Sequence, residues 1–72
     1  MLRGGRLEIV VNGEARDVSE NLSIAALLEE LNVATRGVAV EVNLELVPRV
    51  RHAERKLAAG DQVEVVTLVG GG

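Results

Sequence analysis

The spacing of apolar residues predicts an opening β-hairpin. Residues 7–11 (LEIVV) first alternate and then become fully apolar, which is typical of a strand buried on at least one face. Asn12-Gly13 follows, and this dipeptide favours a tight hairpin because both central positions of a type I′ turn need a positive φ. Residues 14–18 are therefore expected to form the returning strand.

The period changes to that of a helix between Asn21 and Asn32. Four residues at i, i+3, i+4 and i+7 form a single apolar stripe: Ile24, Leu27, Leu28 and Leu31. Ser23 is the expected N-cap, and Asn32 can adopt the left-handed conformation that ends a helix. Because so short a helix is not stable alone in water, its stripe must pack against a sheet.

The second half of the chain reads mainly as strands. Residues 38–42 (VAVEV) are almost continuously apolar, which predicts an interior strand. The remaining expectations are a turn (43–45), a short strand (46–47) ended by Pro48, a loop with one helical turn (49–59), a turn (60–61) and a last strand (62–69). The order ββαβββ predicts one α+β domain over residues 1–72, with residues 1–6 as a loosely ordered lead-in. Its mixed sheet of four to five strands should carry the helix on one face only.

The last strand has apolar residues on both of its faces. If Val63 and Val65 face the helix, the alternate residues from 62 to 68 face away from it. Val66 and Leu68 are among these outward residues, and they lie beside a glycine tail. Exposed apolar residues in such a place are typical of a docking surface, but scattered surface aliphatics are equally common.

Composition excludes several classes of function. A chain of 72 residues buries roughly 60% of its unfolded surface, which allows one modest core and no sizeable internal cleft. It has no Cys for disulfides or thiolate ligands and no aromatic residue for stacking on bases, and its net charge is −3. The apolar stretches are far shorter than the ~20 residues of a membrane helix, and residues 1–6 lack the apolar segment of a secretory signal. These features predict a cytoplasmic protein that binds neither membranes nor nucleic acid.

No catalytic constellation is evident in the sequence. His52 is the only histidine, so a multi-histidine metal site is excluded, and we expect its side chain to be solvated. Ser19 and Ser23 have no neighbouring base. Four basic residues are more typical of a solvated loop than of an anion or RNA site: Arg49, Arg51, Arg55 and Lys56.

Three glycines, Gly70, Gly71 and Gly72, follow the last strand. Their thin backbone can extend roughly 10 Å, which suits a narrow channel on another protein. A terminal carboxylate is a poor electrophile, so it becomes reactive only after another enzyme activates it. Taken alone, a glycine tail is more often a linker or a frayed terminus.

The sequence as a whole resembles the ThiS family of sulfur carriers, which are small proteins of the ubiquitin-like β-grasp fold. Four stretches carry the resemblance: 11–14 (VNGE), 27–31 (LLEEL), 36–49 (RGVAV, Asn43 and VPR) and 60–72 (GDQVE and the final VGGG). Together they span nearly all of the chain. Two departures are the longer start at residues 1–6 and Leu44, which occupies a turn where a small or polar residue is more usual.

The resemblance implies a carrier and not an enzyme, with no cofactor of its own. An adenylating enzyme of the ThiF type would use ATP to activate the Gly72 carboxylate, and a sulfur donor system would convert it into a thiocarboxylate. A thiazole synthase of the ThiG type would accept this sulfur for the thiazole of thiamine. Gly70 and Gly71 would thread into the partner's active site, and Val66 and Leu68 would dock against its surface.

Two alternatives stay open beside this reading. MoaD-type carriers, which serve molybdopterin synthesis, share the fold but are commonly longer and have aromatic and proline residues near the tail. A ubiquitin-like interaction module or modifier would use the same fold without sulfur chemistry.

Overall fold

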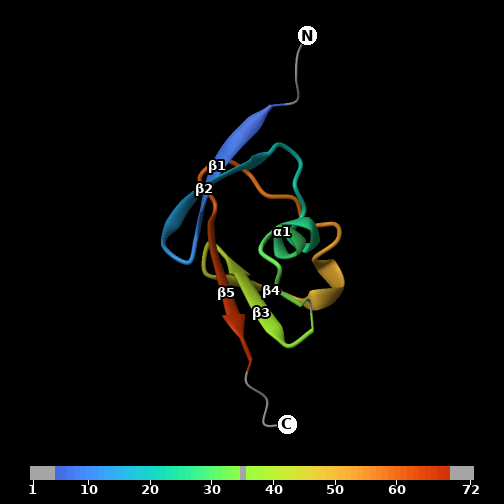
Figure 1. The fold of residues 1–72 in the computed structure, drawn as a ribbon. Helices are drawn as coiled ribbons and strands as arrows, with labels where there is room; N and C mark the ends of the chain where they lie inside the picture. Colours follow the sequence, from blue (N-terminus) through green and yellow to red (C-terminus); the bar gives the residue numbers. More distant parts are fainter. Residues whose placement is uncertain (1–4, 35, 69–72) are drawn as a thin grey trace.

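A computed structural model describes residues 5–34 and 36–68, which form one mixed β-sheet with a single α-helix against one face (Figure 1). In chain order the elements are β1 (Arg6–Val11), β2 (Glu14–Ser19), α1 (Ile24–Glu30), β3 (Val38–Val42), β4 (Glu45–Val47), the 3₁₀ helix η1 (Arg49–Arg51) and β5 (Gln62–Thr67). The predicted order ββαβββ and the α+β fold are confirmed. No helix in the described part of the chain is long and apolar enough to cross a membrane.

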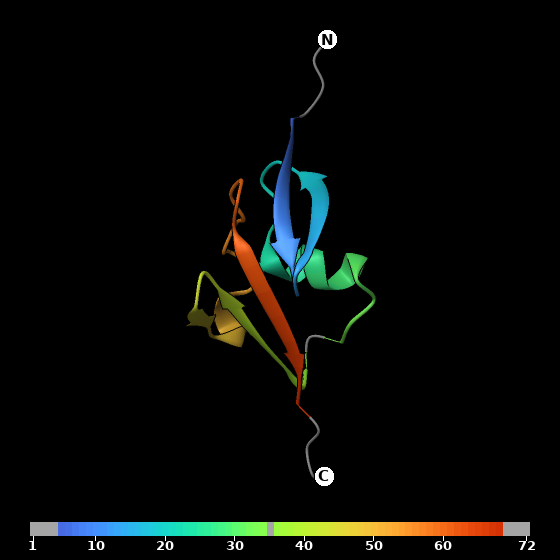
Figure 2. The ribbon, with the colours of Figure 1, turned by 90° about the vertical axis from the view of Figure 1, so that its left-hand side faces the viewer.

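The strands lie in the order β2-β1-β5-β3-β4, so the last strand of the chain occupies the middle of the sheet (Figure 2). β5 runs parallel to β1 and antiparallel to β3. The other two neighbouring pairs, β1–β2 and β3–β4, are antiparallel hairpins. β3 therefore has neighbours on both sides, as its continuous apolar sequence predicts.

Tight turns with left-handed residues close both hairpins. Asn12 and Gly13 have φ values of 49° and 86°, which confirms the predicted turn. Asn43 and Leu44 have φ values of 53° and 71° at the second turn. Leu44 is unusual here, because a branched aliphatic side chain disfavours positive φ.

The helix begins and ends where its sequence predicts. The Ser23 hydroxyl oxygen accepts a hydrogen bond from the Ala26 amide at 3.1 Å, and Asn32 follows the helix at a φ of 63°. Of the apolar stripe, Leu31 is half-buried and the other three residues are fully buried. The stripe therefore attaches the helix to the sheet.

The hydrophobic core of the described residues is built from aliphatic side chains. Its buried members come from the helix, from the helix-facing side of the sheet and from the long loop: Ile9, Val11, Val18, Ile24, Leu27, Leu28, Val38, Val40, Val42, Val47, Leu57 and Val63. Among the described elements no helix lies against the opposite face of the sheet, which is turned to the viewer in Figure 2. One short helix thus leaves one sheet face exposed, as the sequence predicts.

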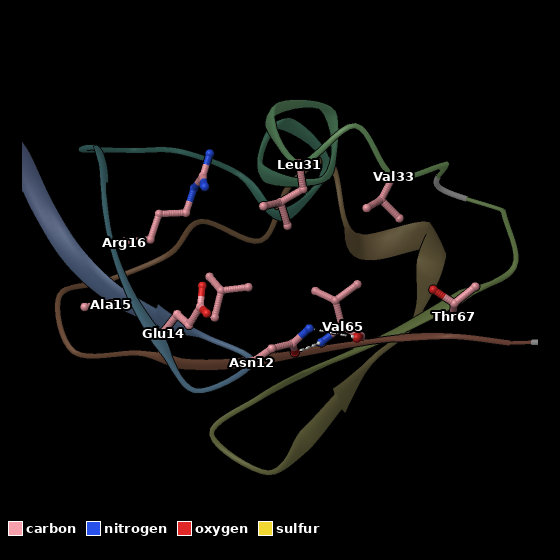
Figure 3. Close-up of a pocket in the computed structure, with 9 residues that line it drawn as sticks. Asn12, Glu14, Ala15, Arg16, Leu31, Val33, Val65 and Thr67 are labelled. Carbon is pink, nitrogen blue, oxygen red and sulfur yellow. Dashed lines mark hydrogen bonds between the residues drawn. The ribbon is translucent and has the colours of Figure 1, made fainter.

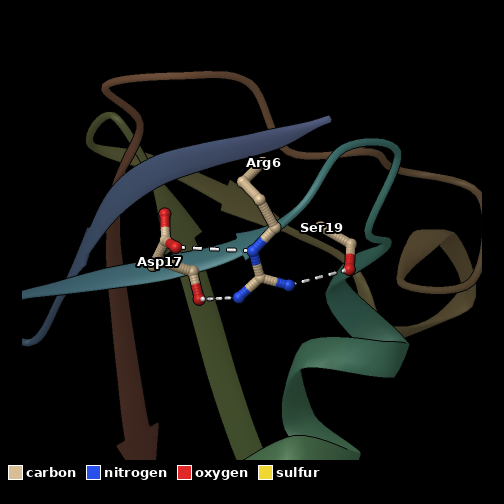
Figure 4. Close-up of polar contacts among 3 residues, drawn as sticks. All are labelled: Arg6, Asp17 and Ser19. Carbon is tan, nitrogen blue, oxygen red and sulfur yellow. Dashed lines mark hydrogen bonds and ion pairs between the residues drawn. The ribbon is translucent and has the colours of Figure 1, made fainter. Parts of the chain in front are cut away.

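The first strand begins at Arg6, one residue earlier than expected. The Arg6 guanidinium reaches across to β2, where its Nε lies 3.4 Å from Asp17 Oδ2 and another nitrogen lies 3.4 Å from Ser19 Oγ (Figure 4). The Glu20 amide also donates to the Gly5 carbonyl at 3.0 Å. The expected lead-in over residues 1–6 therefore overlaps the sheet, and residues 1–4 lie outside the described part of the chain.

His52 is buried, and the expectation of a solvated side chain is wrong. The residue is only 3% exposed, and its Nε2 lies 3.0 Å from the Val47 carbonyl oxygen. Since a carbonyl can only accept, Nε2 is the protonated nitrogen. The His52 carbonyl in turn accepts from the Ala25 amide at 2.9 Å, so this residue joins β4 to the start of the helix. A single inward residue in an irregular loop has no periodic pattern by which the sequence could reveal it.

Replacement of this side chain should destabilise the fold. His52→Ala leaves a cavity and removes the partner of the Val47 carbonyl, so the free energy of unfolding should fall by about 2–4 kcal/mol. Denaturant titration measures this change. The matched control is Val50→Ala, because Val50 is 84% exposed and should change stability by less than about 0.5 kcal/mol. Equal unfolding midpoints for the two variants would contradict the structural role of His52.

Candidate functional site

The predicted site lies at the end of β5, which carries the chain towards the glycines. Val66 and Leu68 are 51% and 55% exposed, whereas Val63 is buried and Val65 is half-buried. The strand therefore turns Val63 and Val65 towards the helix and leaves Val66 and Leu68 on the exposed face, as the sequence predicts. Gly70, Gly71 and Gly72 lie outside the described residues, and the docking role of Val66 and Leu68 stays a prediction.

A side chain extends the hydrogen bonding of β5 beyond its pairing with β1. The parallel register between the two strands ends at Val11 and Val63. The next residue, Asn12, accepts from the Val65 amide at 2.8 Å through Oδ1 and donates to the Val65 carbonyl at 3.2 Å through Nδ2 (Figure 3). The side-chain amide of Asn12 thus replaces a backbone peptide group at a position where β1 has ended and no longer runs beside β5.

The other hairpin turn holds the start of β5 in a similar way. Asn43 Oδ1 accepts from the Gln62 amide at 2.9 Å, and its Nδ2 donates to Asp61 Oδ1 at 3.0 Å. Asp61 is buried, and its second oxygen accepts from the Ala58 amide at 2.8 Å. Sequence reasoning assigned Asn12 and Asn43 only to turns. The signal available for their second role was the residue type, since asparagine combines tolerance of positive φ with a side-chain donor and acceptor.

A further backbone bond holds the outgoing end of β5. The Leu68 amide donates to the Gly37 carbonyl at 2.7 Å, one residue beyond the last assigned strand residue, Thr67. Together with the Asn12 bonds, this contact keeps the strand in the sheet up to the last described residue. The tail therefore departs from a fixed point.

A groove of about 430 Å³ lies on the helix side of β5 (Figure 3). It is lined by Val11, Asn12, Glu14, Ala15, Arg16, Leu31, Val33, Val65 and Thr67. Arg16 lies 3.4 Å from Glu30, so its charge is balanced by the helix. The lining contains no nucleophile beside a base, and no group of three His, Cys, Asp or Glu within residues 5–34 and 36–68 could hold a metal ion. We assign no chemistry to this groove.

Two basic residues of the long loop, Arg51 and Arg55, contact their own chain. Arg51 forms an exposed ion pair with Glu54 at 3.5 Å, and the Arg55 guanidinium donates to the Lys56 carbonyl. The charges of Arg51 and Arg55 are thus used within the loop, and the preference for a solvated loop over an anion site stays a prediction.

A mixed five-stranded sheet with its last strand in the middle and one helix across one face defines the ubiquitin-like β-grasp class of small α+β domains. The end of β5 is the part of this domain that leads into the glycine tail. Comparison with known proteins then gives the family. The model of the ThiS family matches residues 9–72, so this chain belongs to the ThiS family.

Two ThiS proteins and one thiazole synthase are similar to this chain. Sulfur carrier protein ThiS of Thermus thermophilus is 42% identical over 62 residues, which cover 86% of this chain and 95% of the relative. The crystal structure of thiamine biosynthesis protein ThiS from Geobacter metallireducens superposes with a TM-score of 0.79 at 35% identity, covering 92% of this chain and 100% of that chain. Thiazole synthase of Paramagnetospirillum magneticum is 46% identical over 66 residues. The match covers 92% of this chain, which spans only about a fifth of that synthase's length.

The Asn12 contact can be tested apart from its turn. Asn12→Gly keeps a residue that accepts positive φ but removes both bonds to Val65, so the Val65 amide should exchange with solvent faster, and stability should fall by about 1 kcal/mol. Hydrogen exchange followed by NMR measures the first change, and denaturant titration measures the second. Asn32→Gly is the control, because it alters another left-handed asparagine, at the helix end. Unchanged protection of the Val65 amide in Asn12→Gly would contradict the contact.

Proposed function

We propose that this chain is the sulfur carrier for thiazole formation in thiamine biosynthesis. The observation that carries the proposal is its membership of the ThiS family over residues 9–72, a range that includes the three glycines. The Thermus thermophilus relative is named a sulfur carrier protein and has nearly the same length. The chain acts as a carrier on which partner enzymes work.

The reactive group in this proposal is the α-carboxylate of Gly72. A carboxylate oxygen attacks the α-phosphorus of ATP and displaces pyrophosphate, which leaves an acyl-adenylate. Sulfur at the oxidation level of hydrosulfide, delivered by a donor system, then attacks the acyl carbon. AMP leaves, and the product is a thiocarboxylate. Gly72 has no side chain to obstruct this attack, and Gly70 and Gly71 allow the backbone to come close to the nucleotide.

The described part of the chain supports this role by the way it holds the tail's origin. β5 is hydrogen-bonded on both sides, and the bonds from Asn12 and to Gly37 hold it as far as Leu68. A fixed strand followed by four further residues, the last three of them glycines, can reach roughly 13 Å into a partner without unfolding the domain. Val66 and Leu68 lie beside this origin, where their apolar side chains would dock.

Two partners follow from the proposal. A ThiF-type adenylating enzyme supplies the ATP-dependent step, so ATP is bound by the partner and not by this chain. A ThiG-type thiazole synthase receives the sulfur. The second partnership is supported by the thiazole synthase of Paramagnetospirillum magneticum, which contains a segment similar to 92% of this chain. We expect these reactions to take place in the cytoplasm.

Intact mass spectrometry tests the chemistry directly. After incubation with ATP, a ThiF-type enzyme and a sulfur source, the chain should gain the mass difference between sulfur and oxygen. Addition of a thiazole synthase with its substrates should then remove the gain. A variant that lacks Gly72 should stay folded and show no gain, because its tail is one residue too short.

Two outcomes would contradict this proposal. An unchanged mass with an activating enzyme that is active on another ThiS protein would exclude the sulfur-carrier function. A ladder of conjugates to lysine residues would indicate a ubiquitin-like modifier instead.

The docking role of Leu68 can be tested by kinetics. Leu68→Ser removes apolar area from the surface beside the tail, so the KM of the activating enzyme for the carrier should rise by about tenfold with little change in kcat. Pyrophosphate release against carrier concentration gives both constants. Val50→Ser is the matched control, since Val50 is also exposed but lies in η1. If both variants saturate the enzyme at the wild-type concentration, Leu68 has no docking role.

A further inference from the structure

All asparagines of this chain adopt the left-handed conformation, lie in turns and are exposed: Asn12, Asn21, Asn32 and Asn43. They differ in the residue that follows each of them, which is in turn Gly13, Leu22, Val33 and Leu44. Four residues of one type thus share a backbone conformation and access to solvent, and only the first is followed by a glycine. This difference matters for the chemical stability of the side-chain amide.

The side chain of an asparagine, which is among the thermolabile residues, can react with the backbone nitrogen of the next residue. That nitrogen attacks Cγ and forms a C–N bond, its proton passes to the side-chain nitrogen, and ammonia leaves. The product is a cyclic succinimide. Water then adds to one of the two ring carbonyls and opens the ring, which gives either aspartate or isoaspartate, in which the main chain passes through Cβ and Cγ. No oxidant or reductant takes part.

The glycine after Asn12 makes this asparagine the most reactive of the four. Gly13 has no side chain to obstruct the approach of its nitrogen to Cγ. Apart from its two chain neighbours, no described residue comes within 4 Å of the position that a Cβ of Gly13 would take. The leucines and the valine that follow the other three asparagines each carry a bulky side chain next to the attacking nitrogen.

The fold restrains the Asn12 amide by its contact with β5. Oδ1 accepts from the Val65 amide at 2.8 Å, and Nδ2 donates to the Val65 carbonyl at 3.2 Å (Figure 3). Attack on Cγ requires the side chain to turn from Val65 towards the Gly13 nitrogen, which breaks both hydrogen bonds. The reaction therefore proceeds from a locally open form of the hairpin, and its rate follows the population of that form.

Neither product of the reaction can restore both bonds to Val65. An aspartate is ionised at neutral pH and only accepts hydrogen bonds, so the Val65 carbonyl loses its donor. An isoaspartate lengthens the main chain inside a two-residue turn whose flanking residues, Val11 and Glu14, are paired directly. The modification therefore weakens the contact that holds β5 beyond the end of β1.

We propose that Asn12 is a modification site, at which deamidation through Gly13 releases the end of β5 from the first hairpin. This inference does not depend on the proposed function. The second hairpin supplies an internal comparison, because Asn43 also accepts from the backbone of β5, at Gln62, but is followed by Leu44. A φ of 71° is unfavourable for leucine, yet its side chain protects the Asn43 amide from the same reaction.

Peptide mass spectrometry after incubation at mildly alkaline pH tests the position of the site. Trypsin places the asparagines in three peptides: Asn12 in 7–16, Asn21 and Asn32 in 17–36, and Asn43 in 37–49. Only peptide 7–16 should gain the mass difference between a hydroxyl and an amino group. Its conversion should be about tenfold slower than in the chain unfolded in guanidinium chloride, because the bonds to Val65 must open first.

Two results would overturn this assignment. One is equal conversion of the three peptides in the folded chain. The other is unreacted Asn12 in the folded chain at the time when the unfolded chain has reacted completely.

Leu44→Gly moves the reactive dipeptide to the second hairpin. Peptide 37–49 should then gain the same mass, while the thermal midpoint should not fall, since glycine accepts a φ of 71° without strain. Leu44→Ala is the matched control, because it keeps a Cβ beside the attacking nitrogen and should react far more slowly. A new site that appears without loss of stability is not explained by unfolding. No reaction of Asn43 in Leu44→Gly would show that the following glycine does not determine the site, and the inference would be wrong.

Hydrogen exchange followed by NMR tests the consequence for β5. In the isoaspartate form, separated from the other forms by chromatography, the Val65 amide should exchange with solvent about tenfold faster than in the unmodified chain. The Gln62 amide is the internal control, because Asn43 still accepts from it, and it should keep its protection. Unchanged exchange of the Val65 amide would show that the modification does not release β5 and would overturn this part of the inference.

Discussion

The fold depends on the insertion of β5 between β1 and β3. Both hairpins are local in sequence, and β5 joins them through a parallel pairing on one side and an antiparallel pairing on the other. The sheet is therefore incomplete until the final strand is in place, and the short helix has no full surface to cover before then. One consequence is functional. The strand that leads into the glycine tail is also the strand with hydrogen-bonded neighbours on both sides, so force on the tail acts on the centre of the domain and not on a fraying edge.

Two asparagines connect the hairpin turns to this central strand. Asn12 and Asn43 each adopt a positive φ, and each also bonds the backbone of β5, at Val65 and at Gln62 respectively. One residue type meets both demands because asparagine tolerates the left-handed region and has an amide that imitates a peptide group. The turns and the site are thus not independent parts. The conformation that closes each hairpin also places the amide that holds the tail's strand.

The sequence predicts what is local and misses what is not. The stripe from Ile24 to Leu31 repeats with the helical period, and alternation in β5 separates Val63 from Val66, so these features are readable without a structure. The burial of His52 depends on its contact with Val47, in a loop with no period. The opposition of Glu41 and Glu64 depends on a register between strands that are some twenty residues apart, which hydrophobic spacing does not encode. The exposed aliphatic residues beside the tail were therefore predictable, but the pairing of two carboxylates across neighbouring strands was not.

The two faces of the sheet contribute differently to the stability of the domain. On the helix side lies the buried aliphatic core, which supplies most of the hydrophobic stabilisation. On the open side the chain retains opposed carboxylates, a leucine with positive φ and exposed Val66, each of which is unfavourable or neutral for the isolated domain. A domain of this size has only a small margin of stability, about 5–15 kcal/mol, so such features weigh against a substantial part of it. The buried aliphatic side therefore has to supply the stability that outweighs these features.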